Sequence, residues 1–90
     1  MVEYVLDLAT ATRTHPEITV GASPRATVGV LHAARAHAVV SGRTHLTPDD
    51  VQAVAAPSFA HRVAVGGVVD TGAARRVIAD IVARTPVPRG

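Results

Sequence analysis

The sequence predicts an all-α protein, a small bundle of about four helices. Three observations support this fold class. Two segments, Ser23–Pro24 and Thr47–Pro48, each join a capping residue to a proline that suits the first helical position. Aliphatic residues recur at intervals of three and four along several stretches. The chain is 48% hydrophobic but has only two aromatic residues, so its core must use mainly aliphatic side chains that let helices pack closely.

The first helix is predicted over residues 2–14, where apolar residues follow helical spacing: Val2, Val5, Leu6, Leu8 and Ala9. His15–Pro16 ends it, because the residue before a proline is pushed toward extended conformations. Residues 17–20 form an extended link. No capping residue precedes the helix, and we therefore expect the chain to be a piece of something longer.

The central helix is predicted over residues 24–41, with Gly42 at the position that follows the C-cap. At 100° per residue, one face collects five apolar residues: Val28, Leu31, Ala34, Ala38 and Val39. Arg35 falls near the middle of this face. Its stem either covers apolar surface while its head reaches water, or its guanidinium pairs with an acid of another helix.

The third helix begins at Pro48, capped by Thr47. Asp49 and Asp50 are predicted to complement the helix dipole, and Leu46 with Val51 forms a hydrophobic staple. This helix is expected to end near Ala56–Pro57.

Residues 57–63 then make one more short helical turn, which carries Phe59, His61 and Arg62. His61–Arg62 is either a contact for an anion or a partner, or a solvated corner.

Residues 64–70 are predicted to be a loop, because Gly66–Gly67 interrupts a run of valines. Asp70 and Thr71 cap the last helix, over about residues 72–84, whose apolar stripe has helical spacing: Ala74, Val77, Ile78, Ile81 and Val82. We divide the chain into one domain, residues 1–85, and a flexible tail, residues 86–90.

Composition excludes several kinds of chemistry. The chain has no cysteine and no lysine, which removes thiolate zinc sites, a Walker A phosphate loop and Schiff-base catalysis. No two histidines stand three or four apart on a helix, and no metal site is predicted. The net charge is only +2, and the arginines are spread along the chain, so nucleic acid is not expected as a partner. No stretch is long enough to span a membrane.

The segment Gly21–Ala26 is the strongest candidate for a functional site. Ser23 caps a helix, Pro24 takes its first position, and Arg25 projects from its first turn. A cation gains nothing from this end of the helix dipole, whereas an anion bound there would interact favourably with both the dipole and the guanidinium. The alternative is an ordinary capped helix whose second residue is an exposed arginine.

The order of these segments resembles the helical lid of MoxR-type AAA+ ATPases, parts of which magnesium-chelatase subunits share. The resemblance covers roughly residues 4–63. It is carried by five stretches in order: Ala11–Arg13, Gly21–Ala26, Gly42–Arg43, Leu46–Val51 and Ala60–Arg62.

The resemblance implies a lid that closes over ATP bound with Mg²⁺ to a P-loop domain of the full-length protein. Arg25 would be the catalytic "sensor 2" arginine that reaches the γ-phosphate, and Ser23 and Pro24 would complete the nucleotide-binding residues. Walker A, Walker B, sensor 1 and arginine-finger elements are absent from these 90 residues, so the isolated chain should not hydrolyse ATP.

The family further implies a cytoplasmic, chaperone-like ATPase that matures other proteins. Its expected partners are the P-loop domain, neighbouring subunits of a homo-hexamer and a von Willebrand factor A-domain protein. The alternative function is a free-standing helical module that binds protein or nucleic acid through its C-terminal arginines: Arg75, Arg76, Arg84 and Arg89.

Overall fold

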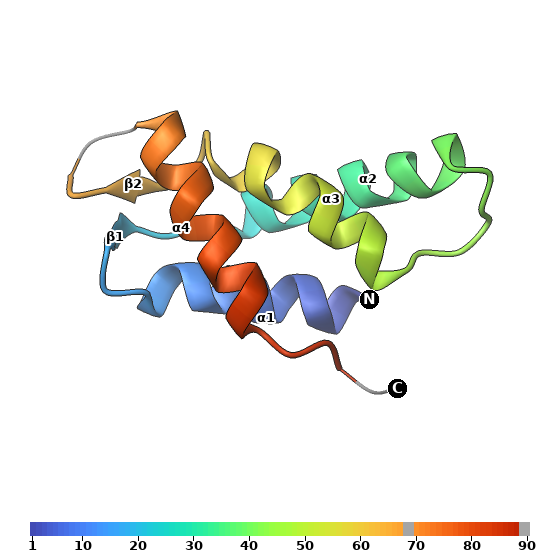
Figure 1. Ribbon diagram of the computed structural model, residues 1–90, viewed down its shortest axis with the longest axis horizontal. Helices are drawn as coiled ribbons and strands as arrows, with labels where there is room; N and C mark the ends of the chain where they lie inside the picture. The colour runs from blue at the N-terminus through green and yellow to red at the C-terminus, as the bar shows by residue number, and fades with distance from the viewer. Residues whose placement is uncertain (68–69, 89–90) are drawn as a thin grey trace.

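The structure is a computed structural model that describes residues 1–67 and 70–88. Within these residues it confirms the all-α class: four helices, with one two-stranded antiparallel sheet at one end of the bundle (Figure 1). The helices are α1 (Val2–Thr14), α2 (Pro24–Val40), α3 (Pro48–Phe59) and α4 (Thr71–Arg84); the strands are β1 (Ile18–Val20) and β2 (Ala64–Val65). The helix α4 crosses α1 and α3, and α2 and α3 form a hairpin.

The helix α1 has the predicted bounds, but a different set of residues is buried. Val5, Leu8 and Ala9 lie in the core, whereas Val2 and Leu6 are about half exposed, at 51% and 52%. Tyr4 and Thr12 are fully buried instead. The Tyr4 hydroxyl accepts a hydrogen bond from Gln52 Nε2 at 3.2 Å, which satisfies its polar end inside the bundle.

The predicted apolar face of α2 was wrong in part. The buried residues of this helix are Ala26, Thr27, Val30, Ala34 and Ala38, while Val28 and Val39 are exposed. Small side chains let the axes of α2 and α3 approach closely, and this close approach decides which face is buried. Arg35 is exposed on α2, so it does not lie on the buried face.

The end of α3 also differs from the prediction. The helix continues through Pro57 to Phe59 and does not stop near Ala56. A proline inside a helix costs about 3 kcal/mol because one hydrogen bond is lost and the ring crowds the preceding turn. Phe59 is completely buried, and burying a large apolar side chain returns roughly 1.5–3 kcal/mol, which favours continuation of the helix.

The strand β2 corrects the predicted loop over residues 64–70, of which residues 68–69 lie outside the described part. Ala64–Val65 pairs with β1, with Ile18 opposite Val65 and Val20 opposite Ala64 across an irregularity. Thr19 strengthens this pairing: its Oγ1 donates to the Ala64 carbonyl at 3.1 Å and accepts from the Gly67 amide at 3.0 Å. Gly66 and Gly67 both have positive φ, which turns the chain away after β2.

The last helix follows the prediction closely. Asp70 caps α4 by accepting hydrogen bonds from the amides of Gly72 and Ala73, at 3.0 and 3.2 Å. The predicted stripe faces the core, where Ala74, Val77, Ile78 and Ile81 are buried and Val82 is partly buried. The predicted flexibility of the tail, residues 86–90, stays untested, and residues 89–90 lie outside the described residues. None of the described helices is both long and apolar enough to cross a membrane.

Candidate functional site

The start of α2 is held in place by the end of α1. Thr12 Oγ1 accepts a hydrogen bond from the Ala22 amide at 2.9 Å, and Arg13 Nε donates to the Ala22 carbonyl at 3.0 Å. Thr12 is fully buried, and its hydroxyl donates to the Ala9 carbonyl at 2.6 Å. Both backbone polar groups of Ala22 are therefore satisfied by two adjacent side chains of α1, which fixes the segment that leads into α2.

Gly21 allows this close approach. A Cβ atom at this position would lie 2.8 Å from Arg13 Cα and Cγ and 2.9 Å from Arg13 N. Contacts this short with backbone atoms cannot be relieved by turning a side chain. The segment before the cap thus lies directly on α1, because residue 21 has no side chain.

We expect Gly21→Ala to lower the free energy of unfolding by about 1–3 kcal/mol, because α1 must move away from the inserted methyl group. Gly29→Ala is the matched control. Its Cβ would meet only Arg62 Nη1 at 3.8 Å, so the higher helix propensity of alanine should raise stability by about 0.5–1 kcal/mol. Urea unfolding of both variants measures this difference. Equal stability of the two variants would contradict the close contact at Gly21.

The helix start has the predicted capping geometry. Ser23 Oγ accepts a hydrogen bond from the Ala26 amide at 3.2 Å, and Pro24 is the first helical residue. The Ser23 carbonyl accepts from the Thr27 amide and hydroxyl, both at 3.0 Å. Ser23 and Pro24 therefore fix the first turn of the helix, from which the Arg25 side chain projects.

Arg25 is exposed, and within the described residues its guanidinium takes part in no hydrogen bond or ion pair. Arg13, by contrast, is bound to the Ala22 carbonyl. This end of α2 suits an anion, since the guanidinium of Arg25 and the positive end of the helix dipole both favour negative charge.

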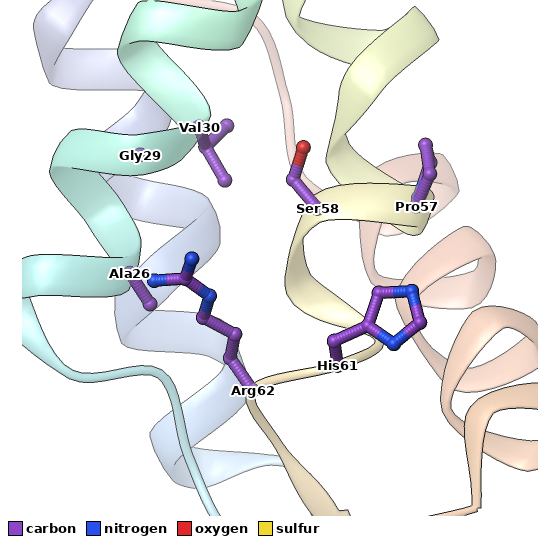
Figure 2. A pocket seen from close by; sticks show the side chains of 7 residues that line it. All are labelled: Ala26, Gly29, Val30, Pro57, Ser58, His61 and Arg62. Atoms are coloured by element: carbon purple, nitrogen blue, oxygen red, sulfur yellow. The ribbon is translucent and has the colours of Figure 1, made fainter.

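A hollow of about 380 Å³ lies between α2 and the end of α3, beside this helix start (Figure 2). We call it the α2–α3 hollow; its lining residues are Ala26, Gly29, Val30, Pro57, Ser58, His61 and Arg62. In Figure 2 the Arg62 side chain reaches across toward α2, whereas the His61 ring turns toward Pro57. The sequence left two interpretations of His61 and Arg62 open: a contact for an anion or a partner, or a solvated corner. Both side chains are exposed, and both line this hollow.

A second cluster joins the end of α2 to the start of α3. The Asp50 carboxylate is fully buried and accepts hydrogen bonds from His37 Nδ1 at 2.7 Å, from Arg43 Nη2, and from the amide and hydroxyl of Thr47, both at 2.9 Å. The sequence predicted both Asp49 and Asp50 as partners of the helix dipole. The structure separates them, because Asp49 is exposed and Asp50 anchors the cluster.

The backbone after α2 brings Arg43 to this cluster. The Arg43 amide donates to the Ala38 carbonyl and the Gly42 amide to the Val39 carbonyl, both at 2.9 Å, with Gly42 at φ 81°. This pair of bonds is a Schellman motif, which requires a left-handed residue where glycine stands. The predicted Gly42 stop is confirmed, and it also positions the ion pair between Arg43 and Asp50.

Burial raises the pKa of the Asp50 carboxyl, but hydrogen bonds from His37 and Thr47 and the charge of Arg43 outweigh this effect, so the pKa lies well below its ordinary value. A lowered pKa in the folded state stabilises the fold above the ordinary pKa of an aspartate, about 3.9. This stabilisation is lost as the pH falls from that range toward the pKa of the folded state.

We therefore expect the urea midpoint of the wild-type chain to fall as the pH is lowered from about 5 to about 2. In Asp50→Asn the urea midpoint should fall less over the same pH range. Asparagine does not titrate, so unfolding of this variant no longer takes up a proton at position 50. Urea titrations at each pH measure the difference. Parallel curves for the two chains would contradict the lowered pKa.

The described C-terminal arginines differ in their contacts. Arg75 and Arg76 are exposed on α4, whereas Arg84 Nε donates to Asp80 Oδ1 at 3.0 Å. Arg89 lies outside the described residues. No group of three or more histidine, aspartate or glutamate side chains in the described part of the chain is placed to hold a metal ion.

Comparison with known proteins gives two kinds of match. A family model described as "AAA lid domain" matches residues 10–81. The chain is 38% identical over 73 residues to the chaperone MoxR1 of Mycobacterium tuberculosis, a match that covers 70% of this chain and 19% of the relative. It is 36% identical over 61 residues to the uncharacterized protein YeaC of Bacillus subtilis, covering 68% of this chain and 19% of that protein.

The chain thus spans about a fifth of the length of these curated relatives. No solved structure gives a significant match. The family match includes Arg13, the α2 start and Arg62, so the whole candidate site lies inside the matched region.

Proposed function

This chain belongs to the AAA lid domain family, in its MoxR-type group, and from this premise we propose that it closes over ATP bound to a P-loop domain of the same full-length protein. In this proposal Arg25 is the sensor 2 arginine, which contacts the γ-phosphate. The observation that carries the proposal is the exposed Arg25 guanidinium on a helix start fixed by Ser23, Pro24 and the contacts of Ala22 with α1.

The residues at the start of α2 fit a phosphate. Arg25 supplies a planar fork of donors that matches two phosphate oxygens, and the positive end of the helix dipole lies beside it. ATP with Mg²⁺ would supply the bond that is broken, and the P-loop domain would hold the metal. Arg25 would stabilise the negative charge that develops during phosphoryl transfer.

The same contact can report the nucleotide state. Arg25 can contact a γ-phosphate only while that phosphate is present, so hydrolysis would release the start of α2. Because Thr12 and Arg13 tie the segment before α2 to α1, such a release would be transmitted to a second helix. The lid angle would then depend on whether ATP or ADP is bound.

The similarity to chaperone MoxR1 supports a chaperone-like role in the maturation of other proteins. With it we propose a homo-hexamer, a von Willebrand factor A-domain partner and a cytoplasmic location. All three rest on the family resemblance.

Peptide mapping of the native protein in its source cells tests the proposed function. We expect a polypeptide of about 30 kDa or more in which a G-x-x-x-x-G-K-[ST] peptide precedes these residues in the same chain. A native product of about 9 kDa, with no such peptide, would contradict the proposal.

A further inference from the structure

The exposed side of α1 combines apolar and acidic side chains. Val2 and Leu6, which stand one helical turn apart, are 51% and 52% exposed. Glu3 and Asp7 have the same spacing and are also exposed, so the four side chains lie together on one side of the helix. We call these four residues the α1 face.

The α1 face takes no part in the packing of the bundle. The helix buries its opposite side, which includes Tyr4, Val5 and Leu8. Within the described residues neither acid of the α1 face belongs to an ion pair. Exposed apolar side chains that lie beside polar groups mark contact surfaces when they are adjacent to one another.

The α2–α3 hollow has the opposite charge. Its lining includes the apolar side chains of Ala26, Val30 and Pro57 and the basic side chains of His61 and Arg62 (Figure 2). No aspartate or glutamate is among the residues that line it. In the described part of the chain neither basic side chain belongs to an ion pair.

Arg62 is placed to receive a carboxylate in this hollow. Its amide donates to the Phe59 carbonyl at 2.8 Å, which fixes the backbone just after α3. Its side chain extends toward α2, where Nη1 lies 3.8 Å from the position that a Cβ of Gly29 would take. Because Gly29 has no side chain, the space beside the guanidinium stays open. A guanidinium offers a fork of donors that matches the two oxygens of one carboxylate.

We propose that the α2–α3 hollow binds the α1 face of a second copy of this chain. The apolar side chains of the α1 face would pack against the apolar lining of the hollow, and its two acids would lie beside Arg62 and His61. Charge complementarity identifies this occupant, because each surface carries the charge that the other lacks. The inference does not depend on the role proposed for Arg25, since neither surface includes that residue.

The proposed contact is head-to-tail, because it joins two different surfaces. Each copy can bind one neighbour through its α1 face and another through its hollow. Contacts of this kind close into rings or continue as open chains. One helix face buries little area, so we expect a weak contact between isolated chains, with a dissociation constant of about 0.1–1 mM.

NMR spectra of the ¹⁵N-labelled 90-residue chain, which has its own buried core, test this inference when they are recorded at increasing concentration. We expect concentration-dependent shifts of the amide signals of the α1 face and of the hollow. Arg62→Glu and Asp7→Arg should each weaken self-association about fivefold or more, because like charges would then meet in the contact. An equimolar mixture of these two variants should associate about as strongly as the wild-type chain, since each variant offers the charge that the other requires.

Arg75→Glu and Glu17→Arg are the matched controls. They make the same changes of charge at exposed positions outside both surfaces, so each should alter self-association by less than about twofold. The inference is wrong if the wild-type chain shows no concentration-dependent shifts up to about 1 mM, or if Arg62→Glu and Asp7→Arg associate as the controls do. It is also wrong if the mixture associates no more strongly than each variant alone, because the two surfaces would then not bind each other.

Discussion

Arg25→Ala in the full-length protein is expected to lower ATP turnover by about tenfold or more while the lid stays folded. The reason is that the guanidinium would stabilise charge that develops on the transferred phosphoryl group, and arginines in this role have large effects on turnover. The side chain is exposed and makes no ion pair in the described residues, so its removal should leave the fold intact. Steady-state ATPase assays with circular dichroism measure both quantities.

Arg35→Ala is the matched control for this experiment. Arg35 is also an exposed arginine of α2, but it lies ten residues further along the helix, near its other end. Its replacement removes the same charge from the same element and should leave turnover within about twofold of wild type. Unchanged turnover in Arg25→Ala would rule out the sensor role.

Asp50→Ala is expected to lower the melting temperature of the chain by about 10 °C or more. The Asp50 carboxylate is fully buried and accepts four hydrogen bonds, so its removal leaves a cavity and four donors without their acceptor. A small domain loses several degrees for each lost kcal/mol. The Nε atom of Arg43 already lies buried without a hydrogen-bond partner in the described residues, so this arginine has little to replace Asp50. Thermal unfolding followed by circular dichroism measures the change.

Asp49→Ala is the control for Asp50. Asp49 is the preceding residue in the first turn of α3, but it is exposed and contributes mainly through the helix dipole. Its loss should cost only about 0.3–1 kcal/mol. Similar melting temperatures for the two variants would show that the buried cluster does not stabilise the hairpin of α2 and α3.

Local signals in the sequence predicted the helix starts and stops. Ser23, Pro24 and Asp70 act within three residues of their own positions, so their roles follow from neighbouring residues alone. Gly42 ends α2 for the same reason.

Features that depend on distant residues could not be predicted in this way. The strand β2 exists because residues 64–65 meet residues 18–20, and the Asp50 cluster requires His37 from another helix. The face of α2 was ambiguous because its alanines and valines occupy most directions around the helix. Packing against the other helices then buried three alanines together with Thr27 and Val30.

The candidate site depends both on local sequence signals and on contacts between residues that are distant in the sequence. Ser23, Pro24 and Arg25 were identified from the sequence, whereas the support from Thr12 and Arg13 became visible only in the structure. Thr12 and Arg13 belonged to the stretches that carried the family resemblance, but their spacing in the sequence did not predict that they contact Ala22. Arg62 likewise required the fold to place it beside Gly29.

The affinities of the full-length protein for ADP and for a non-hydrolysable ATP analogue test the central claim most directly. Comparing wild type with Arg25→Ala isolates the contact with the γ-phosphate, because ADP lacks that group. We predict that Arg25→Ala weakens binding of the ATP analogue about fivefold or more and leaves the affinity for ADP within about twofold. Equal changes for both nucleotides, or no change for either, would contradict the assignment of Arg25 as the residue that senses the γ-phosphate.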